Sequence, residues 1–237
     1  MDFVRGVATI MMITFHFMFD LNFFHIKTFN FDSIGLKIFR LSIPILFLIL
    51  VGMSLTISYS RVRELPKKKR FLKYLKRGSK IFSYGMLITV STFMFLKEGT
   101  IIFGILHLIG LSIILAYPFL GFKYLNLFLG FSIIVLTPLI NGIESNSYFL
   151  LPFGIYPSTF YSLDYFPIFS WFGIVLIGIY LGNQLYPNGK RRINVFEIKH
   201  FLIDFIKTLG RNSLVIYLIH QPVIILGLIL SGLPIAF

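Results

Sequence analysis

Apolar residues occur along the chain in runs of about twenty positions, separated by shorter polar segments. Each run is near the length that a helix needs to cross a bilayer. None shows the ten-residue alternation that marks a transmembrane barrel. The runs cover residues 4–24, 38–60, 79–96, 100–120, 123–141, 166–186 and 211–235. The pattern predicts an all-α fold, a polytopic transmembrane helix bundle of about seven spans that forms a single domain over residues 1–237.

Composition supports an integral, multi-pass membrane protein. Hydrophobic residues make up 57% of the chain and charged residues 13%, whereas soluble domains average about 45–50% and about 25%. The chain has no cysteine, which excludes disulfides, thiolate nucleophiles and cysteine-based metal sites. The net charge of +13 is common in proteins that bind nucleic acid. Its distribution instead indicates membrane orientation, so we expect no nucleic-acid partner.

Basic residues gather in two of the segments between the spans. Residues 61–80 hold ten Lys and Arg, and residues 187–211 hold six. The positive-inside rule places both segments in the cytosol, and seven spans allow this with a cytosolic N-terminus. Segment 61–80 has three interpretations: a stop-transfer loop, an interfacial helix on anionic membrane lipids, or a set of cations for a phosphorylated ligand.

Ionisable residues in the first span lie on one side of the predicted helix. At about 100° per residue, Thr9, His16 and Asp20 fall within about 60° of Arg5. Such a stripe is expected to face the bundle interior or a water-filled cavity. Arg5 lies at its cytosolic end, and His16 is about 16 Å further along the axis, near mid-membrane.

Two other spans each contain a histidine, His107 in "FGILHLIGLS" and His220 in "LGRNSLVIYLIHQP". A single histidine within a membrane is commonly an interhelical hydrogen-bonding residue, and for His107 this structural interpretation is favoured. For His220 both interpretations stay open. His16 shares its stripe with other polar groups, which favours a chemical role. The histidines lack metal-ligand spacing, so we expect no metal site.

Two further segments have specific expectations. Residues 142–165 form a long outer loop rich in aromatic residues, Pro and Gly. Its rings suit either a sugar acceptor or the membrane interface. The glycine pair Gly178 and Gly182 has the small-xxx-small spacing that predicts close helix packing.

Four segments resemble the transmembrane acyltransferase superfamily, and in particular the heparan-α-glucosaminide N-acetyltransferase catalytic domain family in its short prokaryotic form. They read "DFVRGVATIMMITFHFMFDL", "FGILHLIGLS", "FPIFSWFGIVLIGIYLG" and "LGRNSLVIYLIHQPV". Arg5 and His16 also match the Arg-x10-His pattern of the acyltransferase-3 family. The resemblance implies a prokaryotic cell-membrane enzyme that moves an acetyl group from cytosolic acetyl-CoA to an amino or hydroxyl group of a sugar, glycan or glycolipid at the outer face, and it is compatible with a homodimer.

The resemblance also implies site residues. His16 and His25 are candidates for the base, with Asp20 orienting either ring. In the lysosomal branch an Asn commonly stands at the position of His16, and the acid/base histidine follows the first span, near His25. Candidate acetyl-CoA contacts are Arg5, His107, Arg211, Asn212, Ser213 and His220. The fourth span of the lysosomal branch commonly has a Leu-Gln-Arg motif. In this chain Leu106, His107 and Leu108 occupy those positions, so the Arg of the motif is missing.

Two other functions remain open from the residues alone. A proton-coupled transporter or channel would also use intramembrane His and Asp, although we find neither an inverted repeat nor a matching pair of broken helices. A non-catalytic scaffold that kept the family fold would explain the missing Arg of the fourth span.

Overall fold

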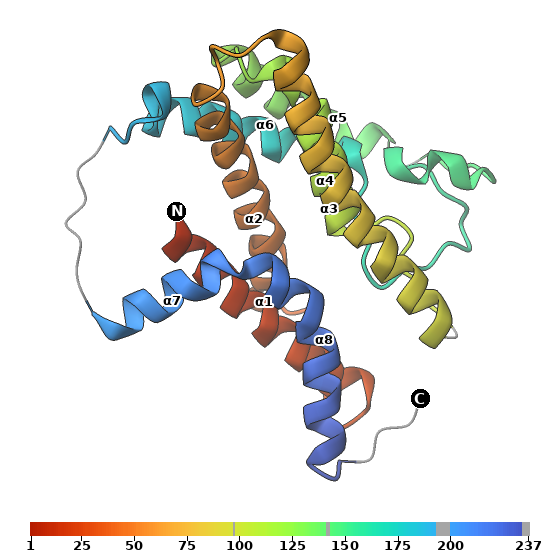
Figure 1. Cartoon of the computed structure of the whole chain (residues 1–237). Coiled ribbons are helices and arrows are strands. Elements are labelled where there is room, and N and C mark those ends of the chain that lie inside the picture. The colour runs from red at the N-terminus through yellow and green to blue at the C-terminus, as the bar shows by residue number, and fades with distance from the viewer. Residues whose placement is uncertain (97, 141–142, 193–199, 234–237) are drawn as a thin grey trace. The chain divides into compact units, whose positions relative to one another are not determined.

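The computed structural model describes residues 1–96, 98–140, 143–192 and 200–233 (Figure 1). These residues form helices and no β-strand, apart from an isolated bridge between Glu144 and Tyr156. The α-helices are α1 Asp2–Phe23, α2 Ile34–Ser60, α3 Lys67–Phe95, α4 Ile105–Leu115, α5 Tyr124–Ile140, α6 Ile168–Leu185, α7 Phe201–Arg211 and α8 Ser213–Leu230. Short 3-10 helices cover Tyr117–Phe119, Tyr148–Phe153 and Pro187–Gly189.

Four of these helices are long and apolar enough to cross a membrane: α1, α2, α6 and α8. Helices α4 and α5 are apolar but shorter. The all-helical prediction is confirmed for the described part of the chain, and these helices indicate an integral membrane protein. The count of seven spans and the orientation of the N-terminus stay predictions.

The chain divides into two compact units. The first consists of residues 1–47 and 195–237, and the second of residues 48–194. The first unit therefore contains α1, the start of α2, α7 and α8. The second contains the rest of α2 and helices α3 to α6. The prediction of a single domain remains an expectation.

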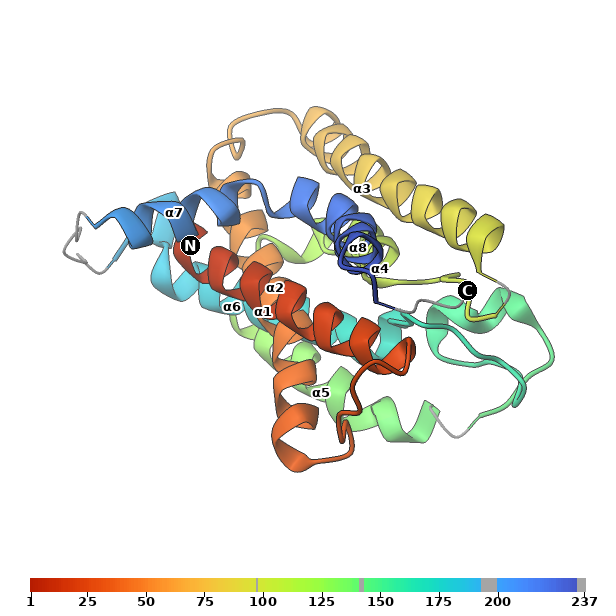
Figure 2. The ribbon, with the colours of Figure 1, turned by 90° about the horizontal axis from the view of Figure 1, so that it is seen from below.

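In the first unit, α7 crosses the beginning of α1 at two glycines (Figure 2). A Cβ on Gly210 would collide with the carbonyl oxygen of Asp2, and a Cβ on Gly6 would collide with the carbonyl oxygen of Ile206. Only glycine permits two helix backbones to approach this closely. After a single residue, Asn212, the chain turns into α8, which also packs against α1.

The second unit is a set of helix pairs with small residues at their contacts. Helix α3 packs on α4, and α5 packs on α6. The second half of α2 lies against α6, where a Cβ on Gly182 would come within 2.8 Å of Thr56 Oγ1. The hydroxyl of Thr56 donates to the carbonyl of Ile179 at 3.2 Å. The close packing predicted from Gly178 and Gly182 is confirmed.

The interpretation of 61–80 as a stop-transfer loop is wrong over most of its length. Residues 61–66 form a turn, and from Lys67 the chain continues as one 29-residue helix, α3. Pro66 precedes its first residue, a position where proline does not interrupt helical hydrogen bonds. Lys, Arg and Leu are good helix formers, so the basic segment and the expected span 79–96 form a single helix.

Other predicted boundaries also differ. The run 100–120 contains the 11-residue helix α4 and the short 3-10 helix Tyr117–Phe119, because residues 100–104 are not helical and Gly104, directly before α4, has an extended backbone. The run 211–235 corresponds to α8, which begins at Ser213. Arg211 instead ends α7, a helix that the sequence analysis treated as loop.

Candidate functional site

The first unit brings the histidines of the first and last predicted spans together. The rings of His16 on α1 and His220 on α8 lie with their centroids 4.7 Å apart, at an interplanar angle of 78°. This is an edge-to-face pair. Residues more than 200 positions apart therefore meet in one place. His16 was predicted as a site residue from its polar stripe, and His220 from the family resemblance.

Both rings use their Nδ1 atom within their own helix. His16 Nδ1 is 2.9 Å from the carbonyl oxygen of Met12, and His220 Nδ1 is 2.7 Å from that of Tyr217. A carbonyl only accepts hydrogen bonds, so each Nδ1 carries a proton. In the neutral ring, the other nitrogen then bears a lone pair. The Nε2 atom of His220 is buried and has no hydrogen-bond partner among the described residues.

A carboxylate and an amide lie close in sequence to the histidine pair, Asp20 one helical turn after His16 and Gln221 directly after His220. Asp20 follows His16 by four residues and is buried, with 3% of its surface exposed. Its Oδ1 atom accepts a hydrogen bond from Gln221 Nε2 at 2.7 Å. Asp20 Oδ2 and Gln221 Oε1 are buried without a partner in the described part of the chain. Thr9, also on the predicted stripe, is fully buried.

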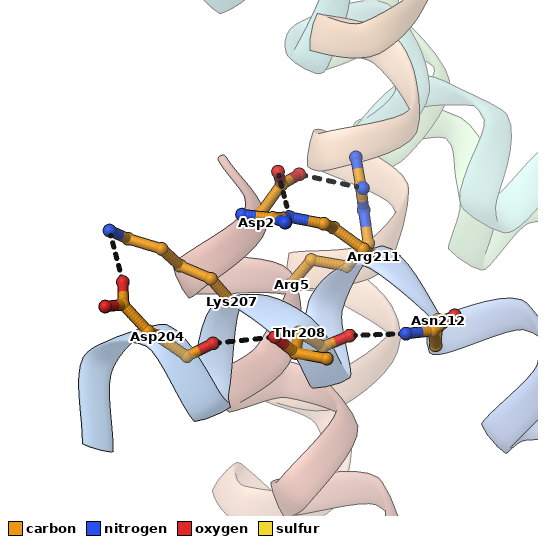
Figure 3. A network of polar contacts seen from close by, with 7 residues as sticks. All are labelled: Asp2, Arg5, Asp204, Lys207, Thr208, Arg211 and Asn212. Atoms are coloured by element: carbon orange, nitrogen blue, oxygen red, sulfur yellow. Dashed lines mark hydrogen bonds and ion pairs between the residues drawn. The ribbon is translucent and has the colours of Figure 1, made fainter. Parts of the chain in front are cut away.

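At the other end of α1, two arginines share one carboxylate (Figure 3). Arg5 Nη1 lies 3.2 Å from Asp2 Oδ1, and Arg211 Nε lies 3.6 Å from Asp2 Oδ2. Nearby on α7, Lys207 pairs with Asp204 at 3.1 Å. With three cations and two carboxylates, the cluster keeps an excess positive charge that suits an anionic ligand.

The predicted residues of the last motif lie where α7 turns into α8. Asn212 is the only residue between the two helices, and its Nδ2 donates to the carbonyl of Thr208 at 2.9 Å. Ser213 is the first residue of α8. Arg211 and Asn212 are exposed and Ser213 is partly buried. The N-terminal end of α8 therefore lies in sequence beside the arginine cluster, with its backbone N–H groups available.

His25 is not part of the α1–α8 pair. It lies in the turn after α1, is exposed, and has a left-handed backbone conformation with a φ of 57°. Nine residues separate it from His16, which corresponds to about 13 Å along a helix axis. The structure thus joins His16 with His220 and leaves His25 at the end of the helix. Its role as a base stays a prediction.

His107, in the second unit, uses both of its ring nitrogens. Its Nδ1 accepts a hydrogen bond from the backbone N–H of Gly104 at 3.2 Å, and its Nε2 lies 3.3 Å from Thr89 Oγ1. Asp164 Oδ2 accepts the next N–H, that of Ile105, at 3.1 Å. Together they cap the N-terminus of α4. This arrangement favours the structural interpretation of His107, and its contact with acetyl-CoA stays untested.

The expected outer loop is packed around its own aromatic rings. The Tyr165 ring lies 5.4 Å from that of Tyr156 and 5.1 Å from that of Phe160. Its hydroxyl donates to the carbonyl of Leu151 at 2.6 Å. Burial raises the pKa of Tyr165 above its usual range, so the residue stays protonated and serves as a hydrogen-bond donor. Whereas Tyr165 is partly buried, Tyr161 is 61% exposed.

One residue of this site escaped the sequence analysis. Gln221 was quoted within the last motif but received no role. The signal was its position beside His220, in a helix otherwise almost free of polar side chains. Across the described ranges, no group of three or more His, Asp or Glu side chains lies close enough together to hold a metal ion.

Comparison with known families identifies a match over most of the chain. The profile of the family described as "Heparan-alpha-glucosaminide N-acetyltransferase, catalytic" matches residues 1–222 of the 237. The match runs through both compact units and confirms the resemblance of the four motifs. Comparisons with curated proteins and with solved structures gave no significant match.

Proposed function

We propose that this chain, which belongs to the heparan-alpha-glucosaminide N-acetyltransferase catalytic family, moves an acetyl group from acetyl-CoA to an amino or hydroxyl group of a sugar, glycan or glycolipid. The family points to an acetyltransferase, and the four long apolar helices indicate that it acts in a membrane. The family does not favour the proton-coupled transporter.

The observation that carries this proposal is the imidazole pair between α1 and α8. Each ring is held by its Nδ1 proton, and each presents Nε2 as a base. Acetyl transfer to an amine or hydroxyl requires such a base, because the attacking group must lose its proton as it bonds to the carbonyl carbon. His16 also shares its helix with Arg5 and Asp20, so we assign the base to His16.

The proposed step has a simple balance of bonds and protons. The acceptor nitrogen or oxygen bonds to the thioester carbonyl carbon, and the carbon–sulfur bond breaks. His16 Nε2 takes the acceptor proton and returns it to the departing CoA thiolate. With its Nε2 unprotonated, His220 can accept a hydrogen bond from the charged His16 ring across the two helices. In an alternative route, the acetyl group is transferred first to His16 Nε2 and then to the acceptor. Mass spectrometry of the stalled enzyme distinguishes this acetyl-histidine route from direct transfer.

Asp20 has a positioning role in this proposal. A carboxylate beside an imidazole stabilises the imidazolium that forms when the base takes a proton. Gln221 holds the Asp20 carboxylate through its Oδ1 atom, which leaves Oδ2 for another partner. Gln221 is therefore added to the proposed site, as a residue that acts through Asp20.

The donor end of the site is proposed at the arginine cluster. Arg5 and Arg211 carry more charge than Asp2 neutralises, and arginine binds phosphate groups with paired hydrogen bonds. Asn212 and Ser213 add polar groups at the start of α8. The phosphates of acetyl-CoA would bind here, so that its thioester arm extends along α1 toward His16. The acceptor would enter from the opposite end of α1.

The first test is acetyl-CoA binding to the purified protein in detergent, measured by calorimetry for the wild type, Arg5→Ala and Arg40→Ala. We expect binding by the wild type and by the Arg40 control, an exposed residue of α2 that is not part of the cluster, and a loss of at least tenfold in Arg5→Ala (about 1.4 kcal/mol or more). Absence of binding by the wild type at millimolar concentrations would contradict the acetyltransferase function.

A second test separates the enzyme from a scaffold that kept the fold. Proteoliposomes would be given acetyl-CoA and a panel of amino sugars and glycolipids, and acetylated product would be measured by mass spectrometry. Transfer that depends on His16 supports the proposal. Transfer that is unchanged in both His16→Ala and His220→Ala would exclude this pair from the chemistry.

A further inference from the structure

Helix α7 has an apolar face that the rest of the described chain does not cover. Phe201 is 80% exposed, Leu202 58% and Phe205 52%. The rings of Phe201 and Phe205 stack with their centroids 6.5 Å apart. Exposed apolar side chains are ordinary when single, but here they fall within about 100° of one another around one short helix.

The remaining two sides of α7 have different surroundings. Ile206 and Gly210 lie on the side that contacts α1, at the close backbone crossing described above. The third side carries Asp204, Lys207 and Arg211, and Thr208 lies at its border with the apolar side; these four residues belong to the polar network of Figure 3. Helix α7 is therefore divided into an exposed apolar side, a side packed on protein and a charged side, each about 120° from the next.

This division has the character of a helix at a membrane surface. Such helices combine a strong separation of apolar and charged faces with low overall hydrophobicity. Four charged or hydroxyl residues in an 11-residue helix make α7 unsuited to crossing a bilayer. Segment 187–211, which includes α7, has six Lys and Arg against two acidic residues, a balance that suits anionic headgroups.

The continuity of α7 with α8 indicates that membrane lipid covers the apolar face of α7. Only Asn212 separates α7 from α8, a helix long and apolar enough to span a membrane. On α8, an exposed stripe of Val215, Ile219, Val223 and Leu226 follows helical spacing. Because α8 begins one residue after α7 ends, α7 lies at the depth where the bilayer surface meets this span.

We propose that α7 is an in-plane surface helix whose face of Phe201, Leu202 and Phe205 inserts into lipid. The leaflet is the one on the side of the membrane where the Lys- and Arg-rich segment 187–211 lies. Through the crossing of Gly6 and Gly210, the helix then anchors the beginning of α1 at the bilayer surface. This inference goes beyond the proposed acetyl transfer and does not depend on it.

The absence of native cysteine makes the proposal directly testable. Single substitutions Phe201→Cys, Phe205→Cys, Asp204→Cys and Arg211→Cys in the full chain would each carry a nitroxide label. The labelled proteins would be reconstituted in vesicles of phosphatidylcholine and phosphatidylglycerol. Spin-label power saturation with oxygen, which partitions into lipid, and with a water-soluble nickel chelate then measures the depth of each label.

We expect the labels at 201 and 205 to lie about 5–10 Å into the boundary between headgroups and acyl chains and the labels at 204 and 211 to be accessible to the nickel chelate. Each variant is first checked for an unchanged melting temperature in detergent. Equal nickel accessibility at all four positions would overturn the proposal. So would shielding of positions 201 and 205 from both reagents, because that result would show that protein, including a second copy of the chain, covers the face.

Discussion

The two compact units each bury histidine among apolar helices, but they use the imidazole differently. In the second unit, His107 has both nitrogens in hydrogen bonds that complete the fold, one to Gly104 and one to Thr89. In the first unit, as far as the structure describes it, His16 and His220 each use only Nδ1 for this purpose. A histidine that the fold occupies at both nitrogens is a structural residue, whereas one with a free nitrogen remains available for proton transfer.

The largest effect that follows from this difference is on activity. His16→Ala should lower the rate of acetyl transfer by about 10²–10⁴-fold, because a general base contributes that much. The melting temperature should change little, since the ring's one hydrogen bond is to a carbonyl that already lies within helix α1. Initial rates in proteoliposomes, normalised to folded protein, provide the measurement.

Two histidines serve as controls for this variant. His25→Ala should keep a rate within a few-fold of wild type if His16 is the base. His200→Ala tests a histidine whose side chain caps α7, where Nδ1 accepts from the N–H of Leu202. A complete loss of acetyl transfer in His25→Ala, together with an active His16→Ala, would show that His25 is the base and His16 is not.

The next effect is on stability, and it concerns His107. His107→Ala should lower the free energy of unfolding by about 2–4 kcal/mol, because it removes a buried ring and a helix cap together. The ring packs against Phe82 and Phe103, at centroid distances of 5.1 and 5.6 Å. Unfolding titrations in mixed detergent micelles would measure this change in the free energy of unfolding. An unchanged stability with lost acetyl-CoA binding would instead make His107 a ligand contact.

A third variant tests how tightly the second unit surrounds His107. A Cβ on Gly85 would lie 2.8 Å from His107 Nδ1, so Gly85→Ala should destabilise the protein by about 1–3 kcal/mol through overpacking. Gly227→Ala is the matched control, because its Cβ would meet nothing within 4 Å. That control should raise stability by up to about 1 kcal/mol, as alanine favours helix. Equal effects of both changes would show that His107 is not held as described.

Much of the first unit could be predicted from local sequence. The apolar run 4–24 corresponds to α1 within two residues, since a membrane-length run of one type leaves few alternatives. The polar stripe predicted from helical spacing contains Thr9 and Asp20, and both are buried. The family was recognisable from four short motifs, and its match covers residues 1–222.

Other features depend on contacts that local patterns do not contain. The pairing of His16 with His220 and of Asp20 with Gln221 joins positions about 200 residues apart. Helix α7 was missed because its charges suggested a loop, although its apolar residues follow helical spacing. The short length of α4 depends on a cap in which Asp164, from a distant loop, accepts from Ile105.

The smallest expected effect on stability tests whether Thr89 and His107 form a hydrogen bond or are only in contact. Thr89→Val removes the hydroxyl that lies 3.3 Å from His107 Nε2 and that donates to the carbonyl of Ile101. Interhelical hydrogen bonds in membrane proteins average about 0.6 kcal/mol, so the loss of stability should be of this order. Combined with His107→Ala in a double-mutant cycle, the coupling should be of similar size. A coupling of zero would leave His107 Nε2 without a structural partner. His107 would then have a free nitrogen, as His16 and His220 do, and the distinction between the two units would have to rest on the surrounding residues instead.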